Sequence, residues 1–234
     1  MKKIIFYLAL ALILLFSGAA RAQQVGLIDH TRVEEFDFSP FYSYSRADFS
    51  PVDGTGDVEK LINQILGFRL NFRVSPDLQV HGLYGTTETE FGSNKFDDGT
   101  VLGVGFQFLI EPDPQLYMKL TGAFQSHDDQ DMRAGSGDIQ IVSDWQVGFL
   151  LGRHTVETDN FGHTQDFHAY TGVLYSGREV ETTNGSSLDY ELENFANLSI
   201  TAGVMYNLVD FLSLELEGQT GAIDAVSGRF IYYF

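Results

Sequence analysis

The 234-residue chain carries 32 acidic residues against 14 lysines and arginines, a formal net charge of −18, and it contains no cysteine. We therefore expect no nucleic-acid partner, because such binding depends on basic side chains that neutralise phosphates, and no disulfide bond can form. Glycine is frequent at 24 residues, with 20 phenylalanines and 11 tyrosines. This composition is typical of aromatic-rich strands joined by tight turns, in one domain.

The first 22 residues have the organisation of a cleaved secretory signal peptide. Lys2 and Lys3 give a positive start, an unbroken apolar run covers residues 4–16, and the small-residue motif "ARA" occupies 20–22. The run is shorter than the ~20 residues that a membrane-spanning helix needs, so cleavage is favoured over an anchor. Removing three basic residues from the 14 leaves 11 against 32 acidic ones, so the mature domain, 23–234, has a net charge of −21.

Ten segments alternate apolar with polar residues, the period of a β-strand with one face toward hydrocarbon. The sequence predicts an all-β fold, a closed antiparallel transmembrane β-barrel of about ten strands, with eight or twelve as alternatives. The first strand is the weakest prediction, because Pro40 cannot donate a ladder hydrogen bond. The predicted strands are 36–46, 64–74, 78–89, 100–110, 115–124, 139–152, 166–178, 198–208, 212–217 and 226–234.

Two segments illustrate the expected faces. In 64–74, Phe68 falls on the apolar face and Arg69 on the polar one. In 139–152, Ile139 and Ile141 share their parity with Trp145, so all three are expected to face lipid.

The connections alternate in length, as they do in outer-membrane barrels with short periplasmic turns and longer external loops. The predicted short turns are 75–77, 111–114 and 209–210. The predicted external loops lie near 47–63, 89–99, 125–138, 179–195 and 219–225. Segment 153–165 is long for a periplasmic turn, and "DNFG" at 159–162 is expected to turn an extended hairpin.

A soluble β-sandwich also has alternating strands and is the alternative fold. Aromatic residues placed near predicted strand ends favour the barrel, because they suit the girdles at a membrane interface. They are Tyr42, Tyr44, Tyr84, Tyr206, Tyr232 and Phe234.

The segment "GRFIYYF" at 228–234, with alternating apolar residues and a terminal phenylalanine, resembles the C-terminal assembly signal of Gram-negative outer-membrane barrels. Over the mature chain, the sequence resembles the small barrels of the OmpA/OmpX/OmpW type. The resemblance implies location in the cell outer membrane, contact with its lipid and lipopolysaccharide, and recognition of Phe230, Tyr232 and Phe234 by the barrel-assembly machinery. It also implies that the last strand closes the barrel against the first.

The polar face gathers charges that we expect to form a network in the barrel lumen, with His81 beside them. A near-balanced set in a narrow interior should pair, because an unpaired buried charge is costly. The network would either fill the lumen or line a narrow, porin-like channel for ions or small solutes. Its members are Arg69, Arg73, Lys119, Asp144, Asp166, His168, Arg178, Glu215, Glu217 and Arg229.

Catalysis has two candidate pairings: Asp166 with His168, and His127 in an external loop amid acidic residues 128–131. Neither a GxSxG nor an HExxH motif occurs. An enzyme of the outer membrane, either a protease or a lipid A-modifying barrel, is therefore the third-ranked hypothesis for the function. We expect no catalytic residues, no cofactor and no dedicated metal site.

Divalent cations could still bind the acidic loops, at "DGTGD" 53–57 and "DDQD" 128–131, because hard cations take oxygen ligands. The leading hypothesis for the function is a non-enzymatic barrel with acidic external loops that contributes to envelope integrity or surface interaction.

Overall fold

The computed structural model describes residues 36–52, 57–113, 115–133, 137–158, 164–183, 187–192 and 197–234, and its regular structure there is all β. The predicted signal peptide lies outside these residues. In the described ranges, no helix is both long and apolar enough to cross a membrane.

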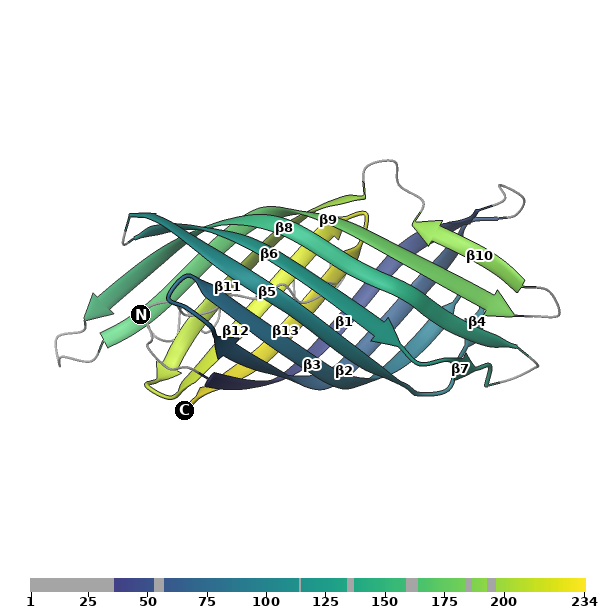
Figure 1. Ribbon diagram of the computed structural model, residues 1–234, viewed down its shortest axis with the longest axis horizontal. Coiled ribbons are helices and arrows are strands. Elements are labelled where there is room, and N and C mark those ends of the chain that lie inside the picture. Colours follow the sequence, from purple (N-terminus) through teal and green to yellow (C-terminus); the bar gives the residue numbers. More distant parts are fainter. Residues whose placement is uncertain are drawn as a thin grey trace, which may run out of the picture.

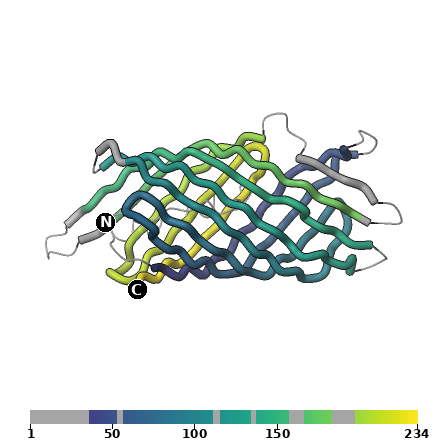
Figure 2. Tube along the Cα trace, in the orientation of Figure 1, coloured from purple at the N-terminus to yellow at the C-terminus, as the bar shows by residue number. Residues whose placement is uncertain are grey.

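Ten antiparallel strands form a closed barrel, and three short strands, β4 (Asn94–Lys95), β7 (Gln130–Asp131) and β10 (Ser187–Leu192), extend it (Figure 1). The predicted fold class and strand number are confirmed. Figure 2 shows the first and last strands side by side, as predicted, where β13 pairs with β1 from Asp37↔Tyr233 to Arg46↔Asp224. The ten are β1 (Phe36–Pro51), β2 (Glu59–Arg73), β3 (Leu78–Phe91), β5 (Gly99–Asp113), β6 (Leu116–His127), β8 (Asp138–Thr158), β9 (Thr164–Thr183), β11 (Leu198–Val209), β12 (Leu212–Gly221) and β13 (Asp224–Tyr233).

Pro40 lies within β1, and its effect on the ladder is visible. The partners of β1 on β13 omit Ser39 and Pro40, although pairing with β2 continues through both. A missing backbone donor therefore interrupts one ladder without ending the strand.

The two ends of the barrel differ. At the turn end, residues 74–77, 114–115 and 210–211 connect neighbouring strands. The β8–β9 hairpin also lies at this end and remains paired as far as Thr158↔Thr164, so it is extended as predicted. The turn predicted at 159–162 lies outside the described residues. At the loop end lie β4, β7 and β10, away from the C-terminus (Figure 1).

Several predicted loop residues belong to strands instead. Strand β1 continues to Pro51, β2 begins at Glu59, and β9 continues to Thr183. Only residues 222–223 separate β12 from β13, so the prediction of a long loop at 219–225 is wrong. Strand β10 pairs with β9 on one side and with β1 on the other, and so spans the gap left where β11, β12 and β13 end.

An apolar belt surrounds the barrel between its two ends. Large apolar side chains of alternate residues are exposed to the surroundings, for example Leu66 on β2, Val104 on β5 and Ile200 on β11, each at least 60% exposed. Toward the loop end the outward positions turn polar after an aromatic residue, as in the succession Tyr84, Thr86, Glu88 on β3. An apolar belt with an aromatic border toward the loop end is typical of the surface of a membrane barrel.

On β8 a bulge interrupts the outward alternation. The ladder with β9 shifts register between Ile141 and Ser143, which leaves Val142 as the extra residue of a bulge. Ile139 and Ile141 are consequently buried in the lumen, whereas Trp145 stays on the outer face. The prediction that all three face lipid is wrong for the two isoleucines, because a bulge exchanges the two faces of a strand.

Apolar side chains fill the lumen at the loop end. Leu61 of β2 and Ile139 of β8 belong to one buried cluster, although three strands, β3, β5 and β6, lie between them on that side of the barrel. We call this cluster the loop-end plug. It consists of Ala47, Phe49, Leu61, Phe91, Phe96, Ile139, Ile141, Val180, Ile223 and Ala225, with Met132 packed against it.

Toward the turn end, tyrosine rings lie across glycines of neighbouring strands. Tyr170 pairs with Gly203, and a Cβ atom on Gly203 would lie 2.4 Å from the Tyr170 ring and hydroxyl. Tyr117 covers Gly152 in the same way. Glycine is required at these positions because the ring occupies the space of a side chain.

We predict that Gly203→Ala destabilises the folded barrel by about 1–3 kcal/mol, the usual cost of overpacking a filled interior. Gly82→Ala is the matched control, because its Cβ would meet nothing within 4 Å. The measurement is the urea midpoint of the refolded protein. Equal midpoints for the two variants would contradict the packing of Tyr170 on Gly203.

Candidate functional site

Eight of the ten predicted lumen residues are divided among three polar clusters rather than joined in one. Of the ten residues, eight are buried in the interior, and Arg73 and Asp166 are half-buried at the turn end. Two of the ion pairs join residues directly opposite each other on paired strands, Arg229 with Glu215 and Arg178 with Asp144. Cross-strand register therefore decides which groups meet.

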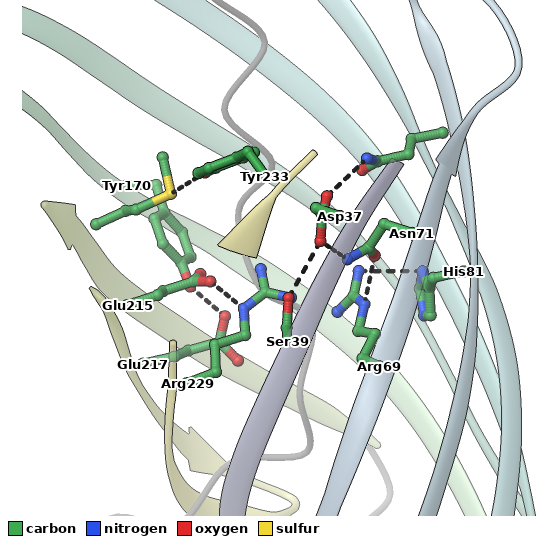
Figure 3. A network of polar contacts seen from close by, with 12 residues as sticks. Asp37, Ser39, Arg69, Asn71, His81, Tyr170, Glu215, Glu217, Arg229 and Tyr233 are labelled. Atoms are coloured by element: carbon green, nitrogen blue, oxygen red, sulfur yellow. Dashed lines mark hydrogen bonds and ion pairs between the residues drawn. The ribbon is translucent and has the colours of Figure 1, made fainter. Parts of the chain in front are cut away.

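The largest cluster surrounds Arg229 (Figure 3). Arg229 on β13 lies directly opposite Glu215 on β12, and its Nε donates to the Glu215 carboxylate. The Tyr170 hydroxyl lies 3.1 Å from Glu215 Oε1 and also contacts the Glu217 carboxylate. Both glutamates thus share one phenolic donor from β9, whose Tyr170 side chain reaches them over Gly203 of the intervening β11.

Arg69 anchors the second half of this cluster. Its Nε donates to Asn71 Oδ1 at 2.8 Å, and Nη2 lies 3.0 Å from His81 Nδ1. Asn71 in turn donates to Asp37, a carboxylate that interacts electrostatically with both Arg69 and Arg229. Asp37 therefore links the two arginines (Figure 3), and the cluster holds two guanidinium groups against three carboxylates.

The second cluster lies toward the loop end. Arg178 Nη2 donates to Asp144 Oδ2 at 2.6 Å, and both side chains are buried. His127 Nε2 lies 3.7 Å from the same carboxylate oxygen. The prediction that His127 lies in a loop is wrong, because β6 extends to His127 and directs its side chain into the lumen.

The third cluster lies at the turn end, where the β8–β9 hairpin leaves the barrel. Asp166 contacts His154 and lies 3.4 Å from His168 Nε2. The predicted closeness of Asp166 and His168 is confirmed. His154 was not predicted, because residues 153–165 were expected to form a turn.

Two basic residues lie outside these clusters. Lys119 is buried with its Nζ 5.0 Å from the centre of the Tyr117 ring, a distance suited to a cation–π contact. Arg73 and Lys119 both line a small hollow at the turn end. A channel lined by Arg69, Arg73, Lys119, Glu215, Glu217 and Arg229 would therefore draw four residues from the largest cluster and two from outside it.

A second small cavity lies between the clusters, lined by Phe41, Leu83, Gln125 and Arg178 among others. Gln125 Oε1 and Arg178 Nε are buried there without a hydrogen-bond partner among the described residues. Buried polar atoms of this kind suit ordered water. This part of the lumen therefore combines apolar walls with polar atoms that an ordered water would satisfy.

Acidic side chains are exposed on the loop end. Arg133 forms ion pairs with Asp97 at 3.5 Å and with Asp98 at 2.6 Å, and so joins the loop after β7 to the loop before β5. Asp128, Asp129 and Asp131 are exposed nearby. The cation site expected at 128–131 remains a prediction, and most of the one at 53–57 lies outside the described residues.

The residues of the expected assembly signal are on the last strand and face outward. Phe230 is 45% and Phe234 74% exposed, and Tyr232 lies on the same face between them. Their recognition during assembly remains a prediction.

Searches of protein-family models and of curated proteins found no match. Among solved structures, an outer-membrane channel from Pseudomonas putida F1 is 10% identical at a TM-score of 0.40, covering 93% of this chain and 98% of that one. The transport unit of the autotransporter AIDA-I from Escherichia coli is 14% identical at 0.40, covering 91% and 95%. The Ralstonia pickettii toluene transporter TbuX is 10% identical at 0.31, covering 88% and 91%. Likeness at this level assigns neither a family nor a function.

We predict that Glu215→Gln lowers the free energy of unfolding by about 3–5 kcal/mol, because it leaves the Arg229 guanidinium buried beside a neutral partner. Asp98→Asn removes an exposed partner of Arg133 and is expected to cost about 1 kcal/mol or less. Urea titration of both variants tests the contrast. A Glu215→Gln barrel as stable as Asp98→Asn would contradict the buried ion pair.

Proposed function

We propose that this chain is a non-enzymatic outer-membrane β-barrel, anchored by its apolar belt and closed to solutes, whose acidic loops contribute to envelope integrity or surface interaction. The observation that carries the proposal is the loop-end plug, in which apolar side chains from opposite walls meet inside the barrel. A conducting barrel needs a water path at this level, and the ten buried side chains of the plug are all apolar.

The outer surface supports a position across a bilayer. On β5 the outward apolar residues run from Leu102 to Ile110. Eight residues at about 3.4 Å each, tilted by about 40°, span roughly 21 Å along the barrel axis, close to the ~25 Å apolar band of outer-membrane barrels. The turn end would then face the periplasm and the loop end the exterior.

The composition of the lumen supports a closed interior. An ion that passed the plug would lose its hydration without gaining a polar ligand, which makes an apolar constriction a barrier. Beyond the plug it would meet Arg178, Arg229 and Arg69 already engaged with carboxylates or amides. A ten-stranded barrel is close to the size at which side chains fill the interior.

The acidic loop end supports a role at the cell surface. Exposed carboxylates beside lipopolysaccharide phosphates would share hard divalent cations, since Mg²⁺ and Ca²⁺ prefer oxygen ligands. Catalysis is not part of the proposal, because His127 is buried against Asp144 rather than directed to the exterior.

We predict that Val104→Arg impairs folding into lipid vesicles by about 2–4 kcal/mol, the cost of a lipid-facing arginine inside the bilayer. Glu88→Arg is the control, because its exposed side chain lies beyond Tyr84 on the loop-end side of the belt. Both variants would be compared by vesicle refolding and urea titration. Equal behaviour would place the belt outside the bilayer.

We predict that the refolded wild-type protein gives no reproducible openings in a planar bilayer. The double variant Phe49→Ala/Phe91→Ala removes two contacting rings of the plug and is expected to raise the current. Wild-type openings with an ion selectivity that changes in Glu215→Gln and Arg69→Gln would favour the narrow channel instead. Heat-modifiable migration in gels would establish that each variant is folded.

A further inference from the structure

Three metal-binding side chains converge at the turn end. His154 comes from β8, and Asp166 and His168 come from β9. Their potential ligand atoms all lie within 4.8 Å of one another. Among the described residues, this is the one place where three or more histidine or acidic side chains meet so closely.

The backbone fixes this arrangement. His154 and His168 are direct partners in the β8–β9 ladder, so their side chains leave the sheet on one face with Cβ atoms about 5 Å apart. Asp166 lies two residues before His168 and therefore shares that face. The imidazole rings are stacked with centres 4.4 Å apart. Paired strands hold all three side chains, so little order must be gained on binding an ion.

Two imidazoles and one carboxylate are the ligands of a borderline transition metal, above all Zn²⁺. Metal–ligand bonds of about 2.0–2.1 Å in a tetrahedron separate neighbouring ligand atoms by about 3.4 Å. The distance from His168 Nε2 to Asp166 Oδ1 is 3.4 Å. Rotation of the stacked rings away from each other would direct both nitrogen lone pairs to one ion.

Neighbouring residues orient the carboxylate. Asn207 Nδ2 donates to Asp166 Oδ2 at 2.8 Å, which leaves Oδ1 on the side of the histidines. Ser213 donates to the Asn207 side chain. Outer hydrogen bonds of this kind hold the ligands of metal sites in place.

The site is also accessible. His168 is buried, whereas the side chains of His154 and Asp166 are 11% and 17% exposed. An ion can therefore enter from the turn end without opening the barrel, and one coordination position faces the mouth.

We propose that His154, Asp166 and His168 bind one divalent transition-metal ion of the zinc class at the turn-end mouth, with water in the remaining coordination position. The site does not depend on the closed or open state of the lumen. It is distinct from the acidic loops, which lie at the other end and offer only oxygen ligands.

The test is calorimetric titration of ZnCl₂ into the metal-stripped, refolded barrel prepared without a histidine tag. We expect one ion per chain at micromolar or tighter affinity, at least 100-fold weaker binding in His154→Gln and in Asp166→Asn, and about 10-fold weaker binding in Asn207→Ala. Co²⁺ should give the visible absorption of a four-coordinate ion. Half-buried His154 is the first choice for substitution because its replacement spares the packed interior.

His127→Gln is the matched control, since His127 also lies near a carboxylate, Asp144, but has no third ligand. It should bind zinc as the wild type does, and heat-modifiable migration would show that each variant is folded. Absence of wild-type binding would overturn the proposal and leave a hydrogen-bonded rim cluster. Binding that persists in folded His154→Gln, or is lost in His127→Gln, would place the ion elsewhere and overturn it as well.

Discussion

Strand β13 pairs with β1 over most of its length, and this pairing closes the sheet so that neither strand keeps a free edge. A closed sheet satisfies the backbone hydrogen bonds of every strand internally, which is the condition for crossing a bilayer with strands. Closure at ten strands also fixes the width of the lumen, and the narrow width brings charges from different strands into contact. Tyr170 on β9 reaches the glutamates of β12 over Gly203 of the intervening β11.

The narrow interior is stabilised differently along its length. At the loop end, hydrophobic contacts between opposite walls exclude water. In the middle and toward the turn end, ion pairs between adjacent strands are supported by amide and phenolic donors. Removing one partner of such a pair costs more than the pair itself contributes, because the remaining charge stays buried. The polar clusters therefore act mainly to fix the register and the relative position of the strands they join.

The alternating pattern predicted the barrel, its strand number and the faces of β2, β12 and β13, because hydrocarbon on one side and a polar lumen on the other impose a period of two. It failed on β8, where the bulge at Val142 exchanges the faces and no local residue pattern marks it. The ends of the strands were missed for another reason. Past the belt, β1 continues as Arg46, Ala47, Asp48, Phe49 with the polar residues outside, the reverse of the pattern that predicts a lipid-facing strand.

The residues of the polar clusters were also predictable only in part. The parity of the strands identified Arg69, Glu215 and Arg229 as lumen residues, but parity alone cannot pair them. Pairing requires the register, which follows from the length of each turn. The two-residue connection at 222–223 sets Glu215 opposite Arg229, whereas the prediction allowed a longer loop there. His154 was missed because an extended hairpin places it opposite His168, which becomes visible only when strand pairing continues past the belt.

Beyond the apolar belt, polar side chains face outward and apolar side chains face the lumen. This reversal allows the barrel strands to continue past the belt at the loop end. An exposed edge of long strands would invite pairing with other chains, but β10 bridges β9 and β1 and covers the edge that the shorter β11, β12 and β13 leave open. The extension then needs its own core, because water rather than lipid surrounds it on the proposed placement. The loop-end plug is that core. The same residues that would close the lumen thus stabilise the extension that carries the acidic loops, so a variant that opened the plug would also loosen the exposed end of the barrel.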